Sequence, residues 1–223
     1  MSVQHRLLSV AFAALVLASP SVNLSAQADP DAQVAGGGTF PPGWNVRTER
    51  NAPLANVKFL AMGSGHHVTL GPAAIFWRNA DTISGNYHVV ASLTQTKNPA
   101  HPESYGIFIG GRNLADSTQA YTYFLVRAVD GKFSIRRRAG YAVRPTAVVD
   151  WTVHDAVVKA DSATGKATNE LGILVKGGKV SFLVNGKEVH AADAAGLDTQ
   201  GIVGYRVNHN LDVHLSALGV HPL

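Results

Sequence analysis

The sequence predicts one all-β domain, an antiparallel sandwich or barrel, from three observations. Apolar and polar residues alternate with a period of two in several runs after Trp44, which is typical of half-buried strands. Dipeptides that suit tight hairpin turns lie between several of these runs. No helical stripe of apolar residues follows residue 28, and we expect at most one helical turn, over Ala191–Leu197. Many short strands with frequent turns favour an antiparallel sandwich or barrel.

The N-terminal segment predicts export. Arg6 precedes an apolar run, Leu7–Ala18, and Ala26–Ala28 has the A-x-A pattern of a cleavage site. This order is typical of a secretory signal peptide, and the apolar run is too short for a membrane anchor. We therefore predict a signal peptide over residues 1–28, no membrane span, and a periplasmic or secreted location after bacterial export. The alternative is a buried N-terminal helix.

The mature chain is expected to begin with a linker and to continue as one domain. Residues 29–40 contain the acidic and glycine-rich string DPDAQVAGGG, which predicts a flexible linker. No second linker and no internal repeat interrupts residues 41–223, so we expect a single domain there. Cleavage would leave 195 residues without a cysteine. A chain of this length buries roughly 70% of its unfolded surface, enough for stability without disulfides.

The charge balance argues against nucleic acid as a partner. Cleavage removes one cation, Arg6, from the 19 basic residues, which leaves 18 basic against 15 acidic residues and a net charge of +3. A nucleic-acid-binding domain usually concentrates its basic residues on one face, whereas here they are scattered along the chain.

Four runs carry the clearest strand signal, and three dipeptides carry the clearest turn signal. The apolar positions of the four runs are Tyr87, Val89, Ala91 and Leu93; Leu171, Ile173 and Val175; Val180, Phe182 and Val184; and Leu211, Val213 and Leu215. The dipeptides are Asp130-Gly131, Gly177-Gly178 and Asn185-Gly186. Each dipeptide can adopt the positive φ angles of type I′ or II′ turns, whose twist matches that of paired strands.

The string YTYFLVRAVDGKFSIRRRAG, Tyr121–Gly140, predicts a hairpin folded about Asp130-Gly131. One face would enter the core, with the cross-strand pairs Ala128–Phe133, Val126–Ile135 and Phe124–Arg137. The other face would carry the pairs Arg127–Ser134, Leu125–Arg136 and Tyr123–Arg138, with Tyr121 beyond them. Opposed residues lie about 5 Å apart at Cβ, so the second face would gather tyrosine rings and guanidinium groups.

Two interpretations of this second face stay open. In one, it is a solvated outer surface on which arginine stems cover the sheet and stack on tyrosine. In the other, it lies on the concave side of a curved sheet, where tyrosine stacks on sugars and arginine donates to hydroxyls or carboxylates. The predicted ligand is then a carbohydrate or glycan, and the predicted contact residues are Tyr121, Tyr123, Arg127, Arg136 and Arg138.

Four segments together resemble a known fold family. They are YGIFIGGRNL (105–114), YTYFLVRAVDGKFSIRRRAG (121–140), NELGILVKGGKVSFLVNGKEV (169–189) and GIVGYRVNHNLDVHLSAL (201–218). Their order is similar to that of concanavalin A-like lectin/glucanase domains, most of all laminin-G-like jelly rolls of secreted bacterial proteins, including 3-keto-disaccharide hydrolase-like domains. The resemblance implies a single-domain jelly-roll sandwich with ligands on its concave face or its rim loops.

The chain departs from the catalytic patterns that this resemblance implies. A glucanase of this fold is expected to carry E-x-D-x-x-E on one strand, and retaining hydrolysis needs two carboxyl groups about 5–5.5 Å apart. The four glutamates, Glu49, Glu103, Glu170 and Glu188, do not form this pattern. ESYGIFIGG stands where the keto-disaccharide family is expected to show GNSGI. We therefore predict no catalytic residue from the resemblance.

Histidines offer an alternative catalytic or metal-binding set. Asp212 and His214 share one face of the last predicted strand, His209 precedes them, and His66–His67 form a second pair. Alternate strand positions suit metal ligands or a general-base histidine oriented by an aspartate. The simpler interpretation is a turn at 208–210 and a half-exposed His214. A zinc site needs further ligands at defined spacing, and the sequence shows none, so no metal is predicted.

Two loops and two tryptophans are further candidates for a binding or a structural role. Lys97–Ser104 and Gly110–Gln119 are expected at the rim of the sandwich, where binding loops gather. Asp116 could help to hold calcium, as rim aspartates do in some laminin-G-like domains; no other cofactor is expected. Trp77 and Trp151 lie at strand ends and are expected in the core, with sugar stacking as the alternative for Trp77.

The function that these observations favour is an exported carbohydrate- or glycan-binding domain without an evident catalytic motif. The alternative is a glycoside-processing enzyme of the 3-keto-disaccharide hydrolase type that uses His209, Asp212 or His214. A third hypothesis is a structural domain that packs on another secreted protein through the same arginine–tyrosine face.

Overall fold

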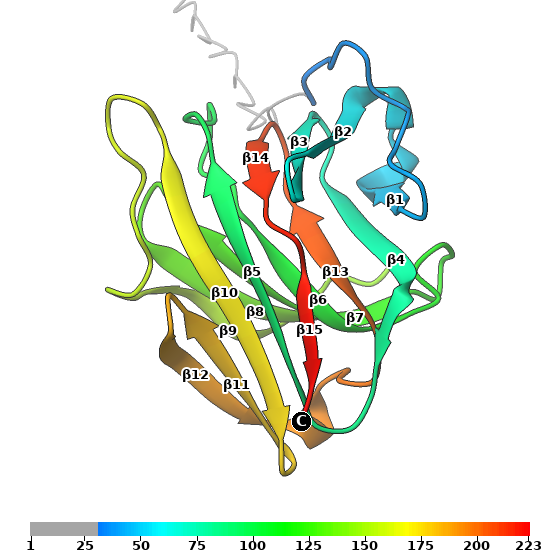
Figure 1. The fold of residues 1–223 in the computed structure, drawn as a ribbon, viewed down its shortest axis with the longest axis vertical. Helices are drawn as coiled ribbons and strands as arrows, with labels where there is room; N and C mark the ends of the chain where they lie inside the picture. The colour runs from blue at the N-terminus through cyan, green and yellow to red at the C-terminus, as the bar shows by residue number, and fades with distance from the viewer. Residues whose placement is uncertain (1–30) are drawn as a thin grey trace, which may run out of the picture.

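The structure is a computed structural model that describes residues 31–223. The predicted signal peptide and the first two residues of the predicted linker lie outside the described residues. The described chain forms two antiparallel sheets that lie one in front of the other (Figure 1). None of its helices is long and apolar enough to cross a membrane.

The first sheet, sheet A, has seven strands. In spatial order these are β1 (Asn45–Thr48), β4 (Ala74–Ile83), β13 (Gly201–Val207), β6 (Tyr105–Arg112), β7 (Ala120–Arg127), β8 (Lys132–Ala139) and β9 (Thr146–Val153).

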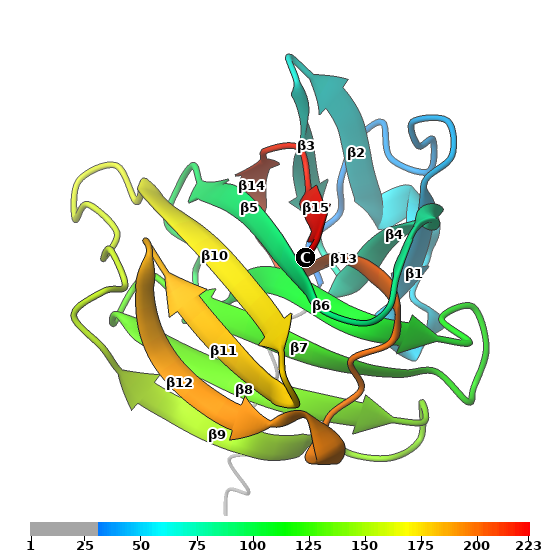
Figure 2. The same ribbon diagram turned by 60° about the horizontal axis from the view of Figure 1, so that its bottom comes forward.

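The second sheet, sheet B, has eight strands. In spatial order these are β12 (Lys187–Asp193), β11 (Lys179–Val184), β10 (Ala167–Lys176), β5 (Tyr87–Gln95), β14 (Asp212–Leu215), β3 (Gly65–Leu70) and β2 (Val57–Met62), with β15 (Gly219–Pro222) paired to β5. Figure 2 shows β12, β11, β10 and β5 layered over β9, β8, β7 and β6.

This architecture confirms the prediction of a single all-β domain that forms an antiparallel sandwich. The helical elements of residues 31–223 are three 3-10 helices of three residues each: η1 (Glu49–Asn51), η2 (Leu54–Asn56) and η3 (Ala194–Gly196). The last of these lies in the segment where the sequence predicts one turn.

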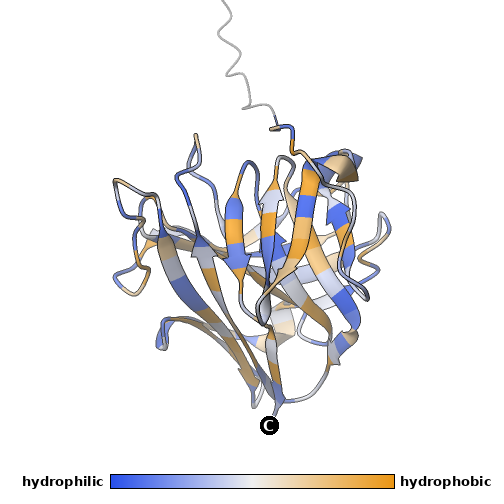
Figure 3. Cartoon of the chain, turned by 45° about the horizontal axis from the view of Figure 1, so that its top comes forward, coloured by the Kyte–Doolittle hydropathy of each residue, from blue (hydrophilic) through white to orange (hydrophobic). Residues whose placement is uncertain are grey.

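The core lies between the two sheets, because strands such as β5 turn every second side chain inward and many strands alternate apolar and polar residues (Figure 3). Phe124 of β7 lies at its centre, with its ring centroid 5.4 Å from that of Phe182 and 6.1 Å from that of Phe133, both in edge-to-face contact. All three rings are buried. Such aromatic pairs add about 0.5–1.5 kcal/mol each beyond the burial of their area.

Two of the three predicted hairpin turns have the predicted two-residue form. Lys176 pairs with Lys179 around Gly177-Gly178, and Val184 pairs with Lys187 around Asn185-Gly186. All four turn residues have positive φ angles, between 51° and 77°, as type I′ turns require.

The third turn was predicted wrongly: the loop at Asp130-Gly131 is two residues longer than the predicted dipeptide turn. Arg127 pairs with Lys132, so the loop has four residues, 128–131. The guanidinium of Arg127 donates to the carboxylate of Asp130 at 3.0 and 2.6 Å, and the Gly131 N–H donates to the Arg127 carbonyl at 3.1 Å. These bonds close the longer loop, which a dipeptide signal alone does not distinguish from a two-residue turn.

The longer loop changes the cross-strand partners but not the faces. Tyr121 pairs with Arg138, Tyr123 with Arg136, and Leu125 with Ser134. A shift of two residues keeps every side chain on its predicted face because the side-chain period of a strand is two.

The described part of the predicted linker lies along the domain. The Ala32 N–H donates to the Asn210 side chain at 2.8 Å, and the Gly38 N–H donates to the Val57 carbonyl at 3.0 Å. Gly37 passes so close to η2 that a Cβ there would lie 2.2 Å from a backbone carbonyl oxygen.

Candidate functional site

The outer face of sheet A carries a second apolar cluster, separate from the core between the sheets. Its members are Ile75, Trp77, Phe108, Leu114, Tyr121, Tyr123 and Leu125, with Trp151 and Ile202 packed at its edge. Sheet A is therefore apolar on both faces, whereas a sandwich sheet usually has a polar outer face. Trp77 is buried, as predicted, but in this outer cluster and not between the sheets; Trp151 is partly buried against the same cluster.

The two predicted contact tyrosines belong to this cluster and do not form an open stacking surface. Tyr121 and Tyr123 are 1% and 3% exposed. Their ring centroids lie 5.5 Å apart, and the Arg206 guanidinium covers the Tyr123 ring at 4.9 Å. Burial raises the pKa of the Tyr123 hydroxyl. The aromatic layer is therefore a floor beneath arginine side chains.

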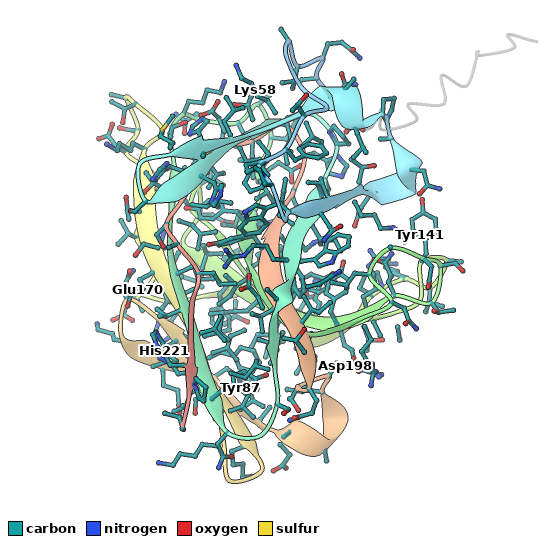
Figure 4. All side chains as sticks on the ribbon, turned by 45° about the vertical axis from the view of Figure 1, so that its right-hand side comes forward. Lys58, Tyr87, Tyr141, Glu170, Asp198 and His221 are labelled. Atoms are coloured by element: carbon teal, nitrogen blue, oxygen red, sulfur yellow. The ribbon has the colours of Figure 1, made fainter. Side chains whose placement is uncertain are left out.

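A pocket of about 280 Å³ opens above one end of this floor, and we call it the arginine pocket. Its walls come from β1 and η1 on one side, from the loop after β8 on the other, and from β4, β7, β8 and β13 below. The lining residues are Arg47, Thr48, Glu49, Arg50, Ile75, Gln119, Tyr121, Arg138, Tyr141, Ala142, Val143, Arg144, Pro145 and Arg206. Figure 4 shows Tyr141 on the opposite side of the molecule from Glu170 and His221 of sheet B.

Glu49 holds the centre of the pocket wall. Its Oε1 accepts hydrogen bonds from Arg206 Nη2 at 2.5 Å and from Arg138 Nη2 at 3.0 Å. Burial alone would raise the pKa of this carboxyl, but Arg206 and Arg138 hold the pKa below its usual range. Glu49 is therefore ionised at neutral pH. Arg206 also donates from Nη1 to the Tyr121 hydroxyl at 3.1 Å, which ties the charge cluster to the aromatic floor.

Backbone strain positions Glu49. Arg50 and Asn51, the next two residues, have φ angles of 55° and 53°, which cost free energy for residues other than glycine. Bonds on both sides hold the turn: the Thr48 hydroxyl donates to the Ala52 carbonyl at 2.7 Å, and the Glu49 N–H donates to the Ala73 carbonyl at 2.8 Å.

The structure brings two of the five predicted contact residues, Tyr121 and Arg138, into this pocket. Arg127 instead binds Asp130 and covers the Trp151 ring at 4.5 Å. Arg136 binds the exposed Asp150 at 2.7 Å.

Several residues of the pocket were not predicted from the sequence, foremost Glu49 and Arg206, which lie 157 positions apart. A usable signal was the single arginine in the otherwise uncharged run GIVGYRV of β13. The predicted rim loop 110–119 supplies Gln119 to this pocket. It also supplies four residues, 113–116, to a neighbouring pocket of about 260 Å³ beside Trp77. The other rim loop, 97–104, lines neither.

The alternative histidine set is not assembled as one site. His209 Nδ1 lies 2.7 Å from Asp31 Oδ1, whereas Asp212 Oδ1 lies 3.0 Å from Nε2 of His67. His214 lies opposite His67, with ring centroids 6.4 Å apart. Among residues 31–223 no group of three or more histidine, aspartate or glutamate side chains is placed to hold a metal ion. Asp116 uses Oδ1 to accept from the N–H and hydroxyl of Thr118.

Comparison with known proteins supports the fold. No family model and no curated protein matches the chain. Among solved structures, the carbohydrate-binding module CBM66 from Bacillus subtilis matches with a TM-score of 0.57 and 11% identity, over 81% of this chain and 96% of the module. A Bacteroides ovatus mixed-linkage glucan GH16 protein matches with a TM-score of 0.54 and 7% identity, over 79% of this chain and 94% of that chain. Alginate lyase A1-II′ matches with a TM-score of 0.52 and 13% identity, over 81% of this chain and 96% of the lyase chain.

These structures are jelly-roll sandwiches, and their similarity confirms the predicted jelly-roll sandwich fold. The narrower resemblance to 3-keto-disaccharide hydrolase-like domains stays a prediction.

Proposed function

We propose that this chain is an exported carbohydrate-binding domain and that the arginine pocket is its binding site. The observation that carries the proposal is the pocket itself: a hollow of about 280 Å³ with an aromatic floor and several guanidinium groups in its walls. Guanidinium N–H groups donate to sugar hydroxyls and carboxylates. The carbohydrate-binding module and the glycan-directed enzymes among the matching structures support the same class of ligand.

The glycoside-processing alternative is less well supported by the pocket. Retaining hydrolysis needs two carboxyl groups about 5–5.5 Å apart, and inverting hydrolysis needs two at a larger separation. Among residues 31–223, Glu49 is the one carboxylate that lines the pocket. Its two arginine partners keep it ionised, so it lacks the proton that a general acid must donate. Binding without hydrolysis is the function that these residues serve best.

A glycan array with the purified chain tests the proposal, followed by titration of the bound sugar into two variants. Tyr141→Ala removes an aromatic ring from the pocket rim, and Lys176→Ala removes an exposed side chain at the far end of β10. We expect Tyr141→Ala to weaken binding about tenfold, in the range of about 1–3 kcal/mol for a lost polar or stacking contact. Lys176→Ala should bind as the parent does. An array without any bound glycan, or an unchanged affinity in Tyr141→Ala, would contradict the proposal.

A further inference from the structure

The walls of the arginine pocket carry far more positive than negative charge. Five arginines line it, and Glu49 is the single acidic residue among the lining residues. Arg47 donates to the backbone carbonyls of Leu114 and Asp116. Arg47 also interacts electrostatically with the Asp116 carboxylate. Within residues 31–223, Arg50 and Arg144 form no ion pair. The wall therefore has uncompensated positive charge on both sides of its opening.

The excess charge reaches the buried part of the pocket. Arg138 and Arg206 are 8% and 5% exposed, and both share one oxygen of one carboxylate, Glu49 Oε1. Two buried cations thus face a single anion. Burial of an unpaired charge is strongly unfavourable, and a counter-charge supplied by a ligand would relieve that cost.

Unused hydrogen-bond donors accompany this charge. A guanidinium has five N–H donors. The Nε–H groups of Arg138 and Arg206 are both buried without a hydrogen-bond partner among the described residues. Buried donors normally have partners, so these two arginines retain capacity for an additional acceptor.

Glu49 shows which acceptor fits. Its carboxylate accepts hydrogen bonds from both guanidinium groups, so these groups are oriented to bind a carboxylate. Carboxylates and guanidinium groups form paired, charge-assisted hydrogen bonds that are about twice as strong as neutral ones. A neutral sugar would satisfy donors without compensating the charge.

We propose that the arginine pocket binds a carboxylate of an acidic glycan, a saccharide that contains uronic acid. This inference rests on the proposed carbohydrate-binding function and specifies its ligand class. The arginines at the rim, Arg50 and Arg144, attract the acidic chain, and the two buried arginines receive the carboxylate beside Glu49.

Calorimetric titration of the purified chain with matched pairs of oligosaccharides tests the inference. The probes are short oligomers of mannuronate, guluronate, galacturonate and glucuronate, each beside its carboxyl-reduced counterpart of the same linkage. We expect at least one acidic oligomer to bind about tenfold more tightly than its reduced counterpart at low ionic strength. The ratio should fall several-fold at about 0.5 M NaCl, because exposed charges are screened.

Two variants that remove one positive charge each complete the test. Arg144→Gln lies at the pocket rim and Lys176→Gln at the far end of sheet B, and both side chains are exposed. Arg144→Gln should weaken binding of the acidic oligomer several-fold more than binding of its reduced counterpart, while Lys176→Gln should change neither.

The outcomes separate this inference from the function on which it rests. If no glycan of either form binds, in this test and on the array, the proposed function fails. If both forms bind equally, the carbohydrate-binding function stands and the inference is overturned. Equal losses in Arg144→Gln and Lys176→Gln would indicate attraction by net charge alone, which also overturns it. Binding of sulfated oligosaccharides without binding of uronates would overturn the assignment of a carboxylate.

Discussion

Replacement of Glu49 by glutamine tests the charge cluster of the arginine pocket through its effect on stability. Glu49 Oε1 accepts two charge-assisted hydrogen bonds, at 2.5 and 3.0 Å, each contributing about 1.5–3 kcal/mol. A glutamine oxygen can accept the same two hydrogen bonds, but each is about half as strong. The free energy of unfolding should therefore fall by about 1.5–3 kcal/mol. Two buried guanidinium groups without a counter-charge push the cost toward the 3–5 kcal/mol typical of broken buried pairs. Because the Glu49 side chain is 30% exposed, solvent screening reduces this, and we expect about 2–3 kcal/mol.

Urea denaturation of Glu49→Gln measures this cost as a lower midpoint with an unchanged m value. In a domain of this size the melting temperature should fall by roughly 4–12 °C. Glu188→Gln is the matched control, since Glu188 is exposed on β12, and it should change stability by about 0.5 kcal/mol or less. A Glu49→Gln variant as stable as the parent would show that Glu49 is not the counter-charge for the two arginines.

The effect of Glu49→Gln should also depend on pH, with a defined sign. The pKa of Glu49 is lower in the folded protein than the ordinary value of 4.5. A group with a depressed folded-state pKa stabilises the fold above its unfolded-state pKa and loses that contribution as the pH falls through the folded-state pKa. The difference between parent and variant should therefore be full at pH 7 and shrink below about pH 4.5.

Three further replacements test the fold. Gly110→Ala should be much more destabilising than Gly177→Ala in a thermal melt: both glycines have positive φ angles, but only at the first would a Cβ lie 2.2 Å from a backbone carbonyl oxygen; equal effects would contradict this close approach. Ile135 is fully buried, so Ile135→Ala should lower the free energy of unfolding by about 2–5 kcal/mol. Arg136→Ala should lower it by about 1 kcal/mol or less, because the ion-pair partner of Arg136 is exposed. Similar losses in the two variants would show that the faces of β8 are assigned wrongly. Burial and a cross-strand histidine lower the pKa of His88. The parent protein should therefore lose stability as the pH falls below about 6.5, and the His88→Gln variant should lose less. Equal losses would contradict the role of this histidine.

Local pattern in the sequence was sufficient to predict the strands of the four alternating runs and two of the hairpins. Alternation of apolar and polar residues indicates directly which side chains are buried, because successive side chains of a strand point to opposite faces. The glycines of the turns at 177–178 and 185–186 indicate positive φ angles. Both signals are properties of adjacent residues, and they stay informative without knowledge of the rest of the chain.

Longer-range features could not be predicted in the same way. The loop at 128–131 depends on a contact between Arg127 and Asp130 that competes with the two-residue turn. The burial of Tyr121 and Tyr123 depends on what covers the outer face of sheet A, which the alternation within β7 does not specify. The arginine pocket depends on Glu49 and Arg206 meeting across 157 positions.

The arginines over the aromatic floor are difficult to explain by stability alone. The guanidinium of Arg206 covers the ring of Tyr123 at 4.9 Å, and an apolar side chain of similar volume would cover it without the cost of desolvating a charge. Replacement of buried ion pairs and triads by apolar residues is often neutral or stabilising. The strained turn at Arg50 and Asn51, which brings Glu49 against Arg206 and Arg138, adds a further cost. Strain and buried charge at the same place are typical of functional sites, and an anionic ligand would supply a second negative charge beside the two arginines that share Glu49.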